Sequence, residues 1–332
     1  RSNNTPKIWQ HQRSKVPQTK TKKIDGDLCL DPIHHDGSLK FIPLEEYSNL
    51  EKKKGYWRPF QLAFILMNLQ SIVDPENSDR QIVDLIWFPT GGGKTEAYLG
   101  LSALTIFYRR LKGGLPKGDL FGGTSIIMRY TLRLLTTQQY ERASSLICAC
   151  ELIRRERFIE LGKEPITIGL WVGGASTPNR NEDAVSDFSK LRKLDNSDYN
   201  FVVMKCPSCG ASIGKIETPR PIGVPRLMGL EKDEVRGEVF FSCENKHCEF
   251  HGSRLPMMVV DEQIYKNPPT LLLSTVDKFA MIPWKIESGS LFGFRRQGEK
   301  SWFRILPPDL IIQDELHLIS GPLGTVVGLY ES

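Results

Sequence analysis

The sequence lacks any apolar run long enough to cross a membrane, which takes about 20 consecutive residues. It also lacks a signal peptide, because its first residues are polar and basic. Internal repeats and low-complexity tracts are missing as well. Hydrophobic residues make up 40% of the 332 residues, enough for a real core. The sequence therefore predicts a globular, cytoplasmic protein and excludes a membrane-spanning or largely disordered one.

Acidic residues are missing from residues 1–24, although the net charge of the whole chain is only +5. Seven basic residues lie in this segment: Arg1, Lys7, Arg13, Lys15, Lys20, Lys22 and Lys23. Such a run could contact a phosphate backbone, but a solvated arm is the more common meaning of a charge run. We interpret residues 1–54 as a basic N-terminal arm or accessory segment.

Beyond residue 57, apolar β-branched runs alternate with helical patterns. This alternation predicts a parallel sheet covered by helices on both faces, with ligands at the carboxyl ends of the strands. A helix with Pro59 in its first turn is expected to come first. Later helices are expected at 96–111 and 136–161. Strands are expected at 82–88, 124–130, 166–172, 270–275 and 310–314.

The segment WFPTGGGKTEAYLG joins the expected strand 82–88 to the expected helix 96–111. A strand, a glycine-rich loop and a helix together make a P-loop, whose backbone N–H groups and helix N-terminus bind phosphates. Lys94 would then contact the β- and γ-phosphates of ATP, and the Thr95 hydroxyl would ligate Mg²⁺. The other loop residues expected at the nucleotide are Thr90, Gly91, Gly92 and Gly93. The alternative is a glycine-rich turn followed by a chance Lys-Thr.

The segment LIIQDELH places carboxylates directly after an apolar strand. At the carboxyl edge of the sheet, Asp314 would hold Mg²⁺ and Glu315 would orient the attacking water. His317 could couple the γ-phosphate to the rest of the protein. An acidic turn after a strand is common, so this segment points to ATP hydrolysis only in combination with the P-loop.

Together, PTGGGKT and DELH resemble motifs I and II of superfamily 2 helicases and translocases, in the DEAH-like group. This resemblance implies a RecA-like P-loop NTPase fold that uses ATP and Mg²⁺ to move on DNA. WRPFQ, at 57–61, is similar to the segment whose glutamine reads adenine, which implies that role for Gln61 with Arg58 beside it. A Ser-Ala-Thr motif and a second RecA-like domain with an arginine finger do not occur before Ser332. We therefore expect a first RecA-like domain, belonging to a longer protein and nearly inactive alone.

The same resemblance implies a DNA track. RYTLRLLTTQQ (129–139) is similar to motif Ia, WVGG (171–174) to motif Ib, and LLLSTVDKF (271–279) to the next strand-end motif. The residues implied as DNA contacts are Arg133, Thr136 or Thr137, Gly173, Gly174, Thr275 and Lys278. FPTGGGKTEAYLG together with QDELHLISGPLGT most resembles the helicase subunit of DISARM anti-phage defence systems, whose relatives work with a DUF1998-type partner subunit.

Four of the seven cysteines form two pairs, KCPSCGAS (205–212) and FSCENKHCEFHG (241–252). In a large chain without a secretion signal, such pairs predict a metal site rather than disulfides. We expect a closed structural zinc site whose ligands are Cys206, Cys209, Cys243 and Cys248. His247 or His251 could replace Cys248, and four free thiols are the remaining alternative.

The cysteine pairs lie in a polar region, about 175–268, that interrupts the α/β pattern. We interpret it as an insertion carrying a zinc ribbon at about 203–254, which divides the RecA-like domain into 55–174 and 269–332. The ribbon could grip DNA, dock a partner or staple the insertion.

Three functions remain open at this point. The chain could be the motor of an ATP-dependent DNA helicase or translocase, or a DNA-stimulated ATPase that remodels or senses DNA without unwinding it. A non-catalytic zinc-ribbon docking scaffold is the third.

Overall fold

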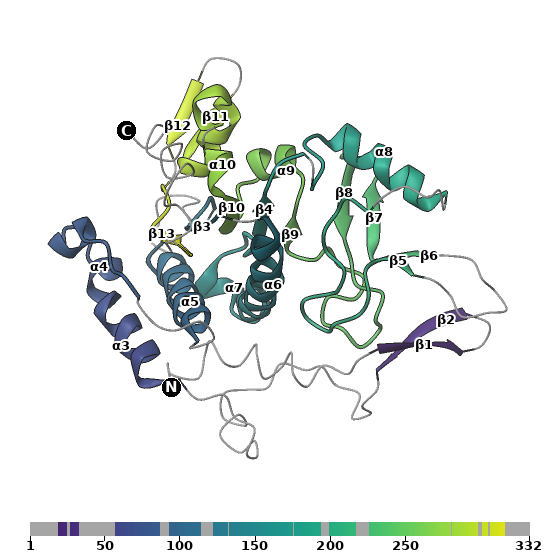
Figure 1. Cartoon of the computed structure of the whole chain (residues 1–332), viewed down its shortest axis with the longest axis horizontal. Coiled ribbons are helices and arrows are strands. Elements are labelled where there is room, and N and C mark those ends of the chain that lie inside the picture. The colour runs from purple at the N-terminus through teal and green to yellow at the C-terminus, as the bar shows by residue number, and fades with distance from the viewer. Residues whose placement is uncertain are drawn as a thin grey trace.

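Figure 1 shows the computed structural model of the chain. It describes residues 19–24, 27–32, 57–86, 93–113, 122–131, 133–174, 176–193, 199–216, 226–279, 281–297, 301–304 and 306–315.

A five-stranded sheet forms the centre of the molecule, in the order β13-β3-β10-β4-β9. All neighbouring strands run parallel. The bounds are β3 Ile126–Tyr130, β4 Ile168–Trp171, β9 Met257–Met258, β10 Leu271–Thr275 and β13 Leu310–Gln313. The strands predicted at 124–130, 166–172, 270–275 and 310–314 are thus confirmed, and the sheet fits the predicted RecA-like fold.

Strands β3, β4 and β10 are buried on both faces of the sheet, to which their alternate side chains point, whereas Ile311 of the edge strand β13 is 58% exposed. Ile126 and Met128 of β3 pack in a large core with residues of α5 (Lys94–Gly113) and α6 (Arg133–Glu156). Ile127, between them, packs in a second core with Leu272 of β10 and residues of α9 (Asp261–Lys266) and the 3₁₀ helix η4 (Ile286–Phe292). Continuous apolar strands are what a doubly covered parallel sheet requires.

The predicted helices are present with small changes in their bounds. The helix expected at 96–111 is α5, which begins at Lys94. The helix expected at 136–161 is α6 followed by the short α7 (Phe158–Leu161), with Arg157 between them.

The strand predicted at 82–88 is wrong for residues 82–86, which are not part of any strand. The side chains of Val83 and Leu85 are 92% and 68% exposed. An extended segment becomes a strand only when a neighbour satisfies its backbone hydrogen bonds, and none of the described strands pairs with this one. Trp87 and Phe88 lie outside the described residues.

Helix α3 (Pro59–Met67) begins with Pro59 in its first turn, as predicted, and α4 (Leu69–Val73) follows it. In Figure 1 these helices lie at one end of the molecule, beside α5. The one buried side chain of α3 is polar: Gln61 is 1% exposed. A 3₁₀ helix, η2 (Ser78–Gln81), precedes the extended residues 82–86.

The predicted insertion lies at the opposite end of the molecule (Figure 1). It contains α8 (Asn181–Arg192) and two antiparallel hairpins. The hairpin strands are β5 Gly214–Ile216, β6 Arg226–Met228, β7 Leu230–Asp233 and β8 Glu238–Phe241. Strand β9 and helix α9 also fall within residues 175–268, and β9 joins the edge of the parallel sheet.

The remaining elements are α10 (Val276–Phe279), the 3₁₀ helix η3 (Ile282–Trp284), and the hairpins β11–β12 and β1–β2. The strands of these hairpins are β1 Thr19–Ile24, β2 Asp27–Pro32, β11 Phe294–Gln297 and β12 Ser301–Arg304. Among the described residues, no helix combines the length and the apolar character needed to span a membrane.

Candidate nucleotide site and cysteine cluster

The sheet register brings the predicted site residues to one edge. Thr275 pairs with Tyr130, and Gln313 pairs with Arg129, so β3, β10 and β13 end at the same level. Asp314 directly follows β13, and its backbone N–H donates to the Arg129 carbonyl at 3.1 Å. Helix α5 begins at this edge, since the Tyr98 hydroxyl in its second turn reaches the Asp314 carboxylate.

The last glycine of the predicted P-loop occupies a tightly packed position. Gly93 has φ of +94°, and a Cβ there would lie 2.5 Å from Nε2 of Gln61. Nε2 of Gln61 donates to the Gly93 carbonyl at 2.7 Å, while Oε1 accepts from the Arg58 backbone N–H at 2.8 Å. Gln61, the residue predicted to bind adenine, is thus hydrogen-bonded to the predicted P-loop. Thr90, Gly91 and Gly92 lie outside the described residues.

A tyrosine that the sequence analysis did not single out connects the two halves of the predicted Mg²⁺ site. The Tyr98 hydroxyl donates to Asp314 Oδ2 at 2.8 Å and lies 3.1 Å from Thr95 Oγ1. It also lies 3.2 Å from the hydroxyl of Tyr130. Burial raises the pKa of Tyr98 and of Tyr130, so both phenols are protonated near neutral pH. The signal in the sequence was the position of Tyr98, three residues after Thr95 and so on the same helix face.

The carboxylate of Asp314 is held at both oxygens, because Oδ1 accepts from the Glu315 backbone N–H at 2.9 Å. Glu315 itself has φ of +51°, in the left-handed region that a side chain with a Cβ rarely adopts. Such outliers occur preferentially at functional sites. His317 lies outside the described residues.

The donors gathered here suit a magnesium ion. A carboxylate and a hydroxyl are hard oxygen ligands of the kind that Mg²⁺ prefers. Gly93 has no side chain of its own, and the Gln61 amide packs closely against it. Thr95 and Asp314 therefore fit the predicted Mg²⁺.

The residues implied as DNA contacts are differently placed. Thr275 is fully buried, and its hydroxyl has no hydrogen-bond partner among the described residues. The Lys278 ammonium donates to buried Asp261 at 2.6 Å and lies 5.6 Å from the centre of the Trp171 ring. In this conformation the Lys278 ammonium is thus paired with Asp261 inside the fold. Asp261 is a partner that sequence reasoning missed.

The glycines of the WVGG segment follow β4. Gly173 has φ of +95°, and a Cβ on Gly174 would lie 2.7 Å from Nδ2 of Asn179. Arg133 begins α6, Thr136 lies in its first turn and Thr137 follows in the second. The side chains of these three residues lie outside the description.

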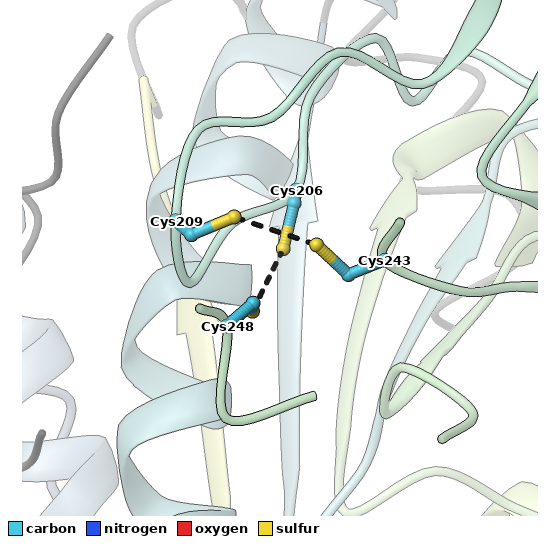
Figure 2. Close-up of side chains that lie close together, drawn as sticks. All are labelled: Cys206, Cys209, Cys243 and Cys248. Carbon is cyan, nitrogen blue, oxygen red and sulfur yellow. Dashed lines mark hydrogen bonds between the residues drawn. The ribbon is translucent and has the colours of Figure 1, made fainter. Parts of the chain in front are cut away.

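The four predicted zinc ligands converge on one point from two separate loops (Figure 2). The Sγ atoms of Cys209 and Cys243 are 3.4 Å apart, and those of Cys206 and Cys248 are 3.9 Å apart. All four sulfurs lie within 4.8 Å of one another. A tetrahedral zinc with bonds of about 2.3 Å would space its sulfurs by about 3.8 Å. The cluster therefore has the size of a structural zinc site.

Local backbone turns aim these thiols. The Cys206 carbonyl accepts from the N–H of Gly210, which has φ of +76°, so the chain folds back on itself after Cys209. In the second loop the Phe250 N–H donates to Sγ of Cys248 at 3.4 Å. N–H groups aimed at sulfur favour a thiolate, the form that binds metal. Contacts with the other thiols lower the pKa of Cys209, whereas burial raises the pKa of Cys206.

The histidine alternative does not describe the cluster. Nδ1 of His251 lies 3.1 Å from the Cys243 carbonyl oxygen, and the side chains of both His247 and His251 are exposed. Neither belongs to the group of ligand atoms within 4.8 Å. Cys148 and Cys150 are buried core thiols on α6.

The cluster is part of the main core. The four cluster cysteines are buried in the same hydrophobic core as Cys148 of α6 and Ile168 of β4. The guanidinium of Arg155, on α6, lies 4.6 Å from the centre of the Phe250 ring. The cysteine loops thus pack directly on a helix that covers the parallel sheet.

Comparison with known proteins gives a relative but no family model. No family model matches the chain. The chain is 40% identical, over 313 aligned residues, to the DISARM protein DrmA of Bacillus paralicheniformis. The alignment covers 86% of this chain and 27% of DrmA, so the chain spans about a quarter of the length of this relative.

Proposed function

Because the chain is a relative of the DISARM protein DrmA, we propose that it is the nucleotide-binding part of an ATP-dependent DNA helicase or translocase in bacterial anti-phage defence. The hydrogen-bonded link from Thr95 through Tyr98 to Asp314 carries this proposal. It joins residues from distant parts of the sequence, and both are of the type that Mg²⁺·ATP needs. A chance glycine-rich turn would require no such convergence.

Each residue has a defined role in this proposal. Lys94, at the start of α5, binds the β- and γ-phosphates, and Thr95 and Asp314 hold Mg²⁺. When bound, Mg²⁺ would neutralise charge on the phosphate oxygens. The Glu315 carboxylate orients the attacking water and accepts its proton. His317 couples the γ-phosphate to the rest of the motor. Gln61 binds adenine once its amide exchanges the P-loop carbonyl for the base.

DNA is the proposed substrate. The resemblance implies that the DNA backbone is contacted by Gly173, Gly174, Arg133 and Thr136. A contact from Lys278 would require its ion pair with Asp261 to open, so we assign Lys278 first to positioning. A DUF1998-type subunit is the proposed partner, and the bacterial cytoplasm the proposed location, since phage DNA enters there.

The cysteine cluster is proposed to hold one structural Zn²⁺. Four thiol donors at the spacing of a closed tetrahedral site favour zinc without an open coordination position. Its role is to fasten the insertion to α6.

The experiment compares Lys94→Ala and Glu315→Gln in a full-length protein that contains this chain. Lys94→Ala should abolish binding of a fluorescent ATP analogue. Glu315→Gln should keep that binding but lose DNA-stimulated hydrolysis by at least about a hundredfold, the contribution of a general base. Lys112→Ala and Glu182→Gln alter exposed residues of the same types and should change neither measurement. Normal DNA-stimulated turnover by Glu315→Gln would refute its assigned role.

A strand-displacement assay on the same protein separates the open alternatives. Displacement together with hydrolysis identifies a helicase. Hydrolysis without displacement supports the ATPase that remodels or senses DNA without unwinding it, and the absence of both in the complex with DNA would leave the docking scaffold.

A further inference from the structure

Tyr98 lies on the face of α5 that points toward the sheet, and it is 4% exposed. Among the described residues, its hydroxyl lies within hydrogen-bond distance of Thr95 Oγ1, Asp314 Oδ2 and the hydroxyl of Tyr130. A phenylalanine would fill the same space without burying a hydroxyl that needs partners. The hydroxyl is thus the part of the Tyr98 side chain that interacts with the candidate nucleotide site.

The arrangement of protons follows from the available acceptors. A phenol has one proton, and a carboxylate is a stronger acceptor than a hydroxyl. Tyr98 therefore donates to Asp314, and its oxygen accepts from Thr95 or Tyr130. Because Asp314 Oδ1 is held by the Glu315 N–H, the carboxylate is fixed at both ends. Each carboxylate oxygen keeps a second lone-pair direction for metal-bound water.

We propose that Tyr98 is a positioning residue for the metal-nucleotide complex. It ties the Asp314 carboxylate to the helix that carries Thr95, so that both donors are held beside one hydroxyl before the nucleotide binds. The proposal rests on the proposed function, since it names a further residue of the same site. It predicts that the Tyr98 hydroxyl affects how nucleotide binding responds to Mg²⁺ and does not affect ATP binding without the metal.

The test is the Mg²⁺ dependence of nucleotide binding by the full chain. A fluorescent ATP analogue is titrated in EDTA and at a series of Mg²⁺ concentrations. In Tyr98→Phe, binding in EDTA should equal wild type. The Mg²⁺ concentration for half-maximal enhancement should rise about tenfold, the loss expected for one hydrogen bond to a charged group. Electron paramagnetic resonance of Mn²⁺ bound with the nucleotide should show the same shift.

Two further variants identify the cause. In an Asp314→Asn background, Tyr98→Phe should add little, because residues that act through one interaction are not additive. Tyr140→Phe is the matched control. It removes another buried hydroxyl, bonded to the Met258 carbonyl on β9, at the far edge of the sheet from β13. It should leave the Mg²⁺ response unchanged.

Three results would overturn the proposal: a wild-type Mg²⁺ response in Tyr98→Phe, an equal loss of binding in EDTA, or loss of the folded state by circular dichroism. The last two would make the hydroxyl a structural group. If the wild-type chain binds no nucleotide under any condition, the proposed function itself fails, which is a separate outcome.

Discussion

At the scale of single residues, the candidate site combines a strained backbone with buried polar contacts. Glu315 is held at φ of +51° directly after the Asp314 carboxylate that receives its N–H. The left-handed conformation costs an L-residue about 1–2 kcal/mol. Glycine has no Cβ and so avoids this cost. Its greater conformational entropy in the unfolded chain cancels about half of that gain in stability.

We therefore expect Glu315→Gly to be more stable than Glu315→Ala by about 0.5–1 kcal/mol. Urea unfolding of the two variants measures the difference, and both lack the carboxylate, so the comparison isolates the backbone. Equal stability would show that the surrounding contacts relax the strain in the alanine variant.

The Lys278–Asp261 pair allows a second residue-scale prediction. Both groups are buried, and burial raises the pKa of Asp261 above its usual range despite the ammonium. Lys278→Met leaves the carboxylate buried without its cation and should destabilise the fold by about 3 kcal/mol. Asp261→Asn combined with Lys278→Met should recover much of this loss.

The stability of the Lys278→Met variant should depend on pH. Without Lys278, the folded-state pKa of Asp261 rises further, so the folded protein binds a proton more tightly than the unfolded chain. Lowering the pH then favours the folded state. The destabilisation by Lys278→Met should be smaller at pH 5 than at pH 8, as measured by urea unfolding at both values. A larger loss at pH 5 would contradict this assignment.

At the scale of elements, the cysteine loops and α6 are packed as one unit. The cluster thiols share a hydrophobic core with Cys148, and Arg155 of α6 lies over the Phe250 ring. A metal in the cluster would therefore stabilise the helix that covers the sheet as well as the insertion.

We predict one zinc per chain by elemental analysis, and its loss in Cys209→Ser. A chelator should lower the temperature of a single unfolding transition, because ribbon and sheet share a core. Cys150→Ser changes a buried thiol outside the cluster and should keep the zinc. A separate early transition of the insertion, with the rest unchanged, would argue against this coupling.

At the scale of the whole molecule, the chain covers 27% of its relative DrmA, and the resemblance to superfamily 2 motors implies a second domain that completes the ATP site. An arginine finger contributes about a thousandfold or more to phosphoryl transfer. This chain alone should therefore bind Mg²⁺·ATP but hydrolyse it at least about a thousandfold more slowly than the full-length protein. Single-turnover hydrolysis of both measures the ratio, and comparable rates would show that the chain holds a complete site.

The sequence by itself determined the parallel α/β layering, the presence of β13 and α5, and which four cysteines come together. These depend on local information: apolar runs, glycine and lysine at fixed spacing, and paired cysteines. Only the tertiary structure decided which groups meet. It placed Tyr98 between Thr95 and Asp314, paired Lys278 with Asp261, set the cysteine loops on α6, and left residues 82–86 without a strand partner. Hydrogen bonds and packing between segments that are distant in sequence depend on the positions of both segments in space. The residue pattern of one segment does not say where the other segment lies.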